Sequence, residues 1–142
     1  MKRLGSVLLL VLSVSCAAGC TPSVMDTVLD ANRPTQVQLR QIQTRYFDIA
    51  NKKKTMGAVI ATLQDLGFII DKASLELGTV TGTKVDGYVL KMTVKVTPRG
   101  SKQMTVRANA QCDLYSVENP LTYQSFFDAL AKSLFLQAHM EE

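Results

Sequence analysis

Two stretches in the second half of the chain alternate between apolar and polar residues with a period of two. They run from residue 88 to 97 and from residue 106 to 114. Successive side chains of a strand point to opposite faces of a sheet, so this alternation predicts two antiparallel strands with one face in water. Asp86-Gly87 before the first stretch predicts a two-residue type I′ hairpin turn between Val85 and Tyr88.

The same alternation assigns side chains to the two faces of the predicted sheet. Pro98 to Ser101 is expected to form the turn between the two strands. The side toward the core is expected to hold Tyr88, Leu90, Met92, Val94 and Val96, together with Val106, Ala108, Ala110, Cys112 and Leu114. The side toward water is expected to hold Lys91, Lys95, Arg107, Asn109, Gln111 and Asp113.

Two further stretches repeat their apolar residues at helical spacing. The first begins near Thr55, and Gly67 stands where a helix commonly ends. The second begins after Asn119, a favourable N-cap, with Pro120 at the first helical position. The apolar stripes are Met56, Val59, Ile60, Leu63 and Leu66 in the first helix and Tyr123, Phe126, Phe127, Leu130 and Leu134 in the second.

Short strands are also expected at 45–49, 68–71 and 78–85, which gives the order β-α-β-β-β-β-α. Amphipathic helices and half-apolar strands must bury their apolar sides against each other. We therefore expect a two-layer α+β fold. In it, a twisted antiparallel sheet of about five strands carries both helices on one face.

The first residues have the order of a secretory signal: Lys2 and Arg3, an apolar run, then small residues. Ala17-Ala18-Gly19-Cys20 resembles the lipobox of bacterial lipoproteins, so residues 1–19 are interpreted as a lipoprotein signal peptide. Cys16 is the competing anchor, but Ser13 stands three positions before it. Cleavage by an ordinary signal peptidase near Ala17 or Gly19 is the alternative.

The lipobox resemblance implies a diacylglyceryl group and an N-acyl chain on Cys20, and several acyl chains hold a protein stably on a membrane. Thr21, which replaces the aspartate that retains enterobacterial lipoproteins at the inner membrane, implies the periplasmic side of the outer membrane. Residues 20–44 are then a lipidated tether, with a partner-binding segment as the alternative. Residues 45–142 are expected to form a single domain.

The chain carries 16 basic and 12 acidic side chains, and removing Lys2 and Arg3 with the signal leaves 14 basic ones, a net charge of +2. The sequence has neither a clustered basic footprint nor a nucleic-acid-binding motif, so no nucleic-acid partner is expected. Once Cys20 is lipidated, Cys112 is the remaining thiol. Its place among the core-facing residues predicts a buried structural role.

No residues suggest catalysis, a cofactor or a metal site. The stretch from Gly78 to Lys84 lacks the spacing of a phosphate-binding loop, and a strand follows it where that loop requires a helix. The lone histidine, His139, lies four residues from the end, where a catalytic base would not be held in place. We therefore expect a protein that is not an enzyme.

Two surfaces are candidates for binding. Lys52, Lys53 and Lys54 are interpreted as a solvated loop before the first helix, with contact to anionic lipids or an acidic partner as the alternative. The second candidate is the polar side of the two alternating strands, defined above from Lys91 to Asp113. An open sheet face or a free strand edge is a natural docking surface in a protein without an active site.

Element order and two short stretches, Leu66-Gly67-Phe68 and Gly78 to Lys84, carry a resemblance to a known family. Residues 45–138 resemble the helix-grip domains of the C-subunit lipoprotein of the outer-membrane β-barrel assembly machinery. That resemblance implies a non-enzymatic accessory subunit of an envelope assembly, secretion or transport complex. The alternative is a carrier or sensor that binds an apolar ligand between the second helix and the sheet, near Met92, Tyr123 and Phe127.

Overall fold

The two alternating stretches pair with each other along nearly their whole length. In the computed structural model, which describes residues 34–139 and the side chains of residues 34–136, strand β4 is Val89–Arg99 and strand β5 is Gln103–Cys112. Their antiparallel register runs from Leu90 opposite Cys112 to Arg99 opposite Gln103. The predicted signal peptide, Cys20 and Thr21 lie outside the described residues.

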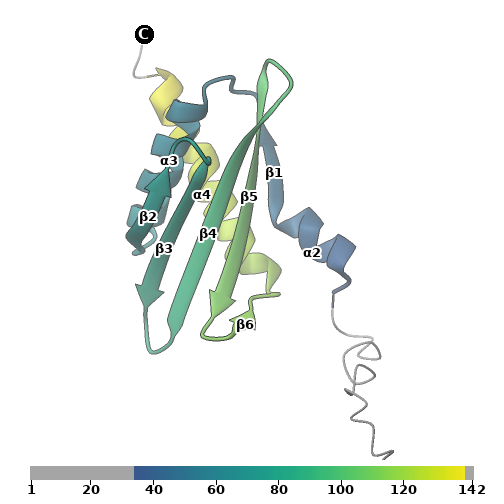
Figure 1. The fold of residues 1–142 in the computed structure, drawn as a ribbon, viewed down its shortest axis with the longest axis vertical. Coiled ribbons are helices and arrows are strands. Elements are labelled where there is room, and N and C mark those ends of the chain that lie inside the picture. Colours follow the sequence, from purple (N-terminus) through teal and green to yellow (C-terminus); the bar gives the residue numbers. More distant parts are fainter. Residues whose placement is uncertain (1–33, 140–142) are drawn as a thin grey trace, which may run out of the picture. The chain divides into compact units, whose positions relative to one another are not determined.

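Four further strands complete an open antiparallel sheet in the described part of the chain. They are β1 (Thr44–Phe47), β2 (Ile69–Ser74), β3 (Thr79–Val85) and the two-residue β6 (Tyr115–Ser116). The strand order is β1-β5-β4-β3-β2, and β6 also pairs with β5. Strands β1 and β2 follow each other in the sequence but form opposite edges of the sheet (Figure 1).

Two helices cover one face of this sheet, as the sequence predicts. They are α3 (Lys52–Asp65) and α4 (Pro120–His139), and they lie together behind the strands in Figure 1. Tyr123, Phe126 and Leu130 of α4 are fully buried, as are Val94 and Val106 of the sheet. The expected α+β fold with two helices on one sheet face is therefore confirmed.

The ends of both helices follow from local chemistry. The backbone N–H of Leu121 donates to Asn119 Oδ1 at 3.0 Å, which makes Asn119 the expected cap of α4. Gly67 follows α3 with φ 85°, a conformation that glycine adopts without a steric penalty. The next backbone N–H, that of Phe68, donates to the carbonyl oxygen of Leu63 at 2.9 Å. This bond turns the chain from α3 into β2.

A third helix, α2 (Gln36–Ile42), lies in the segment that the sequence suggests is a tether. Thr35 and Gln38 form a capping box at its start, and Leu39 is buried. Just after α2, the buried side chain of Gln43 donates from Nε2 to the Tyr123 hydroxyl at 3.2 Å. The sequence places the start of the domain at Arg45. In the structure, the chain already packs on the domain before that residue, from α2 onward.

The turn at Asp86-Gly87 differs from the predicted two-residue form. Val85 pairs with Val89, so the loop has three residues and Tyr88 belongs to it. Tyr88 is exposed instead of facing the core. The prediction fails because an Asp-Gly pair fixes the position of a turn but leaves the loop length to the strand register.

The predicted core-facing run also ends too late in β5. Cys112 is half-buried, while Leu114 is 93% exposed and Asp113 has φ 52°. Asp113 and Leu114 form the turn of an additional hairpin, in which Cys112 pairs with Tyr115 of β6. Leu114 and Asp113 therefore lie at the end of the sheet, and neither belongs to the face to which the alternation assigns it.

The turn between β4 and β5 also lies further along the chain than predicted. Pro98 and Arg99 still belong to β4, and residues 100–102 make the turn. The N–H of Val96 donates across to the Gly78 carbonyl at 2.7 Å. Pro98, two residues later, lies past Thr79, the residue at which β3 begins. A proline is tolerated there because no strand requires its missing N–H.

Candidate functional site on the open face of the sheet

The face of the sheet opposite α3 and α4 carries the candidate partner surface. Lys91, Lys95, Arg107, Asn109 and Gln111 are all exposed, and all lie on β4 and β5 on this open face. The register places Lys91 opposite Gln111 and Lys95 opposite Arg107. The structure thus brings five of the six predicted residues together, and leaves out Asp113 in the β5–β6 turn.

The charge of this open face is strongly one-sided. Its cations are Lys72, Lys91, Lys95, Arg99 and Arg107, whereas Asp71 is the one acidic residue in the described strands. Asp71 Oδ2 accepts a hydrogen bond from Thr83 Oγ1 at 2.7 Å, next to a register shift in β2. The sheet therefore offers little negative charge to neutralise its own cations.

Lys95 and Arg107 are a like-charge pair across neighbouring strands. Residues directly opposite each other in an antiparallel pair have Cβ atoms about 4.5–5.5 Å apart, and like charges there are destabilising. Within the described part of the chain, neither side chain has an ion pair or a hydrogen bond. The isolated domain therefore gains nothing from placing these two charges side by side.

Threonines separate the cations on the open face. Thr79 stands opposite Lys95 on one side, and Thr44 stands opposite Arg107 on the other. In the next row, Thr81 and Thr93 are joined through their hydroxyl groups at 3.3 Å. These short side chains keep the surface low, so that the long basic side chains stand above it.

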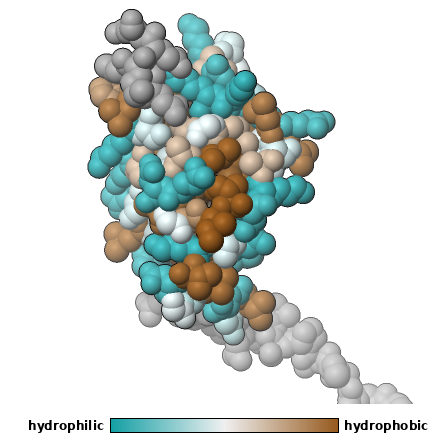
Figure 2. Space-filling view, turned by 90° about the vertical axis from the view of Figure 1, so that its left-hand side faces the viewer, coloured by the Kyte–Doolittle hydropathy of each residue, from teal (hydrophilic) through white to brown (hydrophobic). Residues whose placement is uncertain are grey.

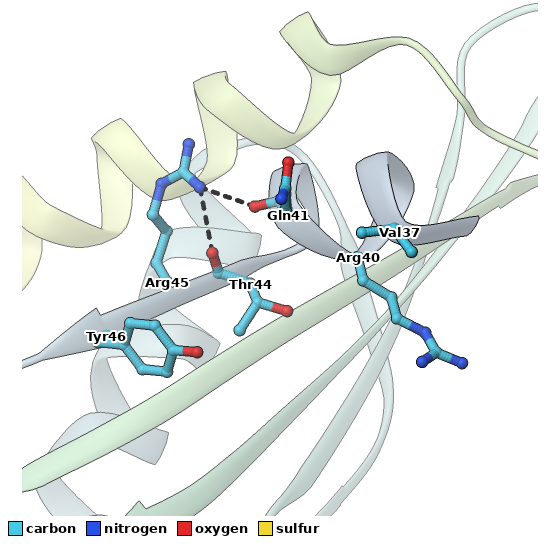
Figure 3. A pocket seen from close by; sticks show the side chains of 6 residues that line it. All are labelled: Val37, Arg40, Gln41, Thr44, Arg45 and Tyr46. Carbon is cyan, nitrogen blue, oxygen red and sulfur yellow. Dashed lines mark hydrogen bonds between the residues drawn. The ribbon is translucent and has the colours of Figure 1, made fainter. Parts of the chain in front are cut away.

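A pocket of about 540 Å³ adjoins this face at its β1 edge (Figure 3). It is lined by Val37, Arg40, Gln41, Thr44, Arg45 and Tyr46 from α2 and β1. Thr44 pairs with Arg107, and the guanidinium of Arg99 lies 3.9 Å from the centre of the Tyr46 ring. The pocket and the basic face are therefore continuous. The sequence predicts neither the pocket nor its contact with this face, because α2 lies in the segment taken as a tether.

The two arginines of the pocket have different roles. Arg45 Nη1 donates to the backbone oxygens of Gln41 and Thr44, both at 3.1 Å, and its guanidinium lies 5.4 Å from the centre of the Phe127 ring. In Figure 3 Arg45 points toward α4, while Arg40 points to the opposite side of the strand. Arg45 thus holds α2 and β1 in place, and exposed Arg40 extends the positive charge of the open face.

The three consecutive lysines do not form one patch. They occupy the first turn of α3, not a loop, because Asn51 caps the helix by accepting from the Lys54 N–H at 3.0 Å. Lys52 Nζ donates to the Glu76 carbonyl at 3.0 Å, which ties α3 to the β2–β3 turn. Lys53 is exposed and Lys54 half-buried. Lys52 therefore has a structural contact, and a lipid or partner contact of Lys53 and Lys54 stays a hypothesis.

The space between α4 and the sheet, where the carrier hypothesis places a ligand, is filled by side chains. Met92, Tyr123 and Phe127 are buried in the core. The Tyr123 hydroxyl donates to the Val117 carbonyl at 2.7 Å and accepts from the Ala110 N–H at 3.3 Å. A second pocket, of about 440 Å³, lies instead along α4 and is lined by Ala131, Lys132, Phe135 and Leu136. A ligand in this space would have to displace these buried side chains and break the contacts of the Tyr123 hydroxyl.

Other chemical groups in the described residues are dispersed. No three of their histidine, cysteine and acidic side chains come together as metal ligands. The side chain of His139 lies outside the described part. Among the described helices, none is long and apolar enough to cross a membrane.

Comparison with known proteins adds no identification. The chain matches no family model and no curated protein. The open basic face and its edge pocket are therefore the features from which a function must be argued.

Proposed function

We propose that the protein is an outer-membrane lipoprotein, anchored through Cys20 on the periplasmic side, that acts as a non-enzymatic accessory subunit of an envelope complex. In this proposal the open face of β4 and β5 binds an acidic surface of another subunit. The lipobox resemblance supports the anchor, and the resemblance of residues 45–138 to an assembly-machinery lipoprotein supports the class of complex.

The observation that carries the docking proposal is the uncompensated charge of the open face. Lys95 and Arg107 repel each other across the strands, with no acidic partner among the described residues. Carboxylates from another protein would attract both side chains and would accept hydrogen bonds from their N–H groups. The edge pocket beside Thr44 offers room for a side chain of the same partner.

Site-specific photo-crosslinking in native membranes tests this docking surface. A photoreactive amino acid at Asn109 samples the middle of the open face, and the same amino acid at Gln124 samples exposed α4 as a matched control. We expect discrete adducts at position 109 that weaken with added salt and with Arg107→Glu. Equal adducts at both positions, or none at 109, would contradict the proposal.

The anchor is tested separately by the intact mass of the membrane-extracted protein. We expect a mature chain that begins at Cys20 and carries the mass of a diacylglyceryl group and one acyl chain. Cys20→Ser should abolish both additions, whereas Cys16→Ser should leave them unchanged. An unmodified mature protein would remove the anchor from the proposal without affecting the crosslinking result.

A further inference from the structure

One end of the sheet exposes a cluster of large apolar and aromatic side chains that the proposed docking face does not include. We call this cluster the hairpin tip. Its members and their exposed fractions are Val85 74%, Tyr88 51%, Val89 44%, Leu114 93% and Tyr115 79%. Single exposed apolar residues are ordinary, but several at one protruding end mark a contact surface.

The backbone brings these five residues together from two hairpins. Val85 and Val89 close the β3–β4 hairpin around Tyr88, and Leu114 and Tyr115 belong to the β5–β6 hairpin. The N–H of Asp113 donates to the Val89 carbonyl at 2.9 Å, which joins the two hairpins side by side. Both hairpins lie at the lower end of the domain in Figure 1. Seen from the β2 side, hydrophobic side chains also gather near this lower end (Figure 2).

We propose that the hairpin tip inserts into the interfacial layer of the lipid bilayer to which the protein is anchored. This inference rests on the lipid anchor of the proposed function. Leucine and valine gain free energy when they leave water, and tyrosine favours the boundary where one end of its ring is apolar and the other is wet. The tip combines these residue types on protruding turns that could enter a membrane without unfolding the sheet.

The place where the tether joins the domain favours the bilayer over other occupants. Helix α2 precedes the Thr44 end of β1, and Thr44 pairs with Arg107 of β5. The tether therefore joins the domain from the direction of the hairpin tip, and not from the direction of the β4–β5 turn. Residues 21–33 separate Cys20 from Pro34 and span at most about 45 Å when fully extended. This length lets the tip reach the membrane that holds the anchor.

The charges at the tip specify which lipids it should prefer. The two turns contain Asp86 and Asp113 and no cation between residues 85 and 89 or between 112 and 115. Hydrophobic transfer would therefore drive the contact of the two turns themselves, since the nearest cations, Lys84 and Lys91, lie outside them. We expect the contact of the tip to form in zwitterionic bilayers and to persist in high salt.

The absence of tryptophan in this chain makes a direct test straightforward. Leu114→Trp places a single reporter at the tip. Leu77→Trp is the matched control, because Leu77 is 63% exposed in the β2–β3 turn at the other end of the sheet. Each lipidated full-length variant is reconstituted in phosphatidylethanolamine–phosphatidylcholine vesicles that contain brominated lipid. We expect quenching and a blue shift at position 114 and neither at position 77.

A second measurement uses the mature chain from residue 20 with Cys20→Ser, produced without residues 1–19, so that neither the signal peptide nor a lipid contributes to its partition into vesicles. The double substitution Leu114→Ser and Tyr115→Ser should lower the partition coefficient by about tenfold or more. The control pair Leu75→Ser and Leu77→Ser should leave it unchanged.

Several outcomes would overturn the inference. These are equal quenching at positions 114 and 77, no quenching at 114, and an unchanged partition coefficient for the tip double variant. A blue shift at 114 that follows protein concentration without vesicles would assign the tip to a second copy of the chain instead. The mass of the reconstituted protein separates the anchor proposal from the tip proposal. If a Leu114→Trp chain carries the lipid mass but its tryptophan is not quenched, the anchor is present and only the tip contact is refuted.

Discussion

The two faces of one sheet are built from the same strands and yet meet opposite requirements. On the helix side, Val94, Val96 and Val106 are fully buried beneath α3 and α4. On the open side, their neighbours Lys95 and Arg107 face each other without a described partner. The apolar residues of the helix side are buried within the chain, whereas the cations of the open side face water and have no acidic partner among the described residues. Stability and the proposed binding are thus assigned to alternate residues of the same strands.

The largest change in the free energy of unfolding is expected when a core side chain on the helix side is removed. Phe126 is fully buried and its ring contacts that of Phe127, with centroids 5.2 Å apart. Phe126→Ala should lower the free energy of unfolding by about 3–5 kcal/mol because it leaves a cavity. The control Thr93→Ala, on the open face, loses only a cross-strand hydroxyl contact and should lower it by no more than about 1 kcal/mol. Urea denaturation measures both, and equal losses would contradict the contrast between the faces.

The next largest change in stability is expected just before β3, where the backbone at Gly78 approaches the backbone of β4 closely. Gly78 has φ 66°, and a Cβ there would lie 2.3 Å from the Val96 carbonyl oxygen. Gly78→Ala should therefore destabilise the domain by about 2–3 kcal/mol. Gly57 lies in α3 with open space around it, so Gly57→Ala should stabilise by about 0.5–1 kcal/mol. Thermal unfolding distinguishes them, and shifts of the same sign would refute the argument.

A smaller loss is expected at the polar contact inside the helix layer. The Tyr123 hydroxyl joins Gln43, Ala110 and Val117, so Tyr123→Phe leaves two buried groups and one part-buried carbonyl without this partner. We expect a loss of about 1–3 kcal/mol in the free energy of unfolding. Hydrogen exchange should show faster exchange at Ala110. An unchanged stability would mean that α2 and β5 do not depend on this hydroxyl.

The smallest effect tests the open face, where a substitution is expected to stabilise the domain. Arg107→Glu places a carboxylate opposite Lys95, so the cross-strand repulsion becomes an attraction. The free energy of unfolding should rise by about 0.2–1 kcal/mol at low ionic strength, and the gain should shrink in salt. The same variant should bind the proposed partner less well. A variant that loses stability would show that Arg107 supports the fold itself.

The sequence predicts the elements on the helix side well, because their apolar residues recur at fixed periods. The stripe from Tyr123 to Leu134 and the alternation from Leu90 to Val96 both appear on the core side in the structure. The prediction fails at Leu114, where alternation continues past the end of the strand into a turn. It also omits α2, whose single buried residue, Leu39, is too weak a periodic signal in a polar segment.

The candidate site also has a part that the sequence predicts and a part that it does not. Alternation alone places Lys91, Lys95, Arg107, Asn109 and Gln111 on one face, because successive side chains of a strand point to opposite sides. The edge pocket could not be predicted, since it depends on α2 and on which strand β1 joins. The hairpin tip was equally inaccessible, because it forms only where two hairpins distant in sequence lie side by side.

The sequence by itself determined which side chains share a face, since the periods of strands and helices are local properties of the backbone. Only the tertiary structure decided the neighbours across strands: Lys95 against Arg107, β1 against β5, and Val89 beside Asp113. Register and strand order arise from burying all the apolar stripes at once, which is a property of the whole chain. The charge of the open face could thus be counted from the sequence, but its repulsion and its neighbouring pocket exist only in the fold.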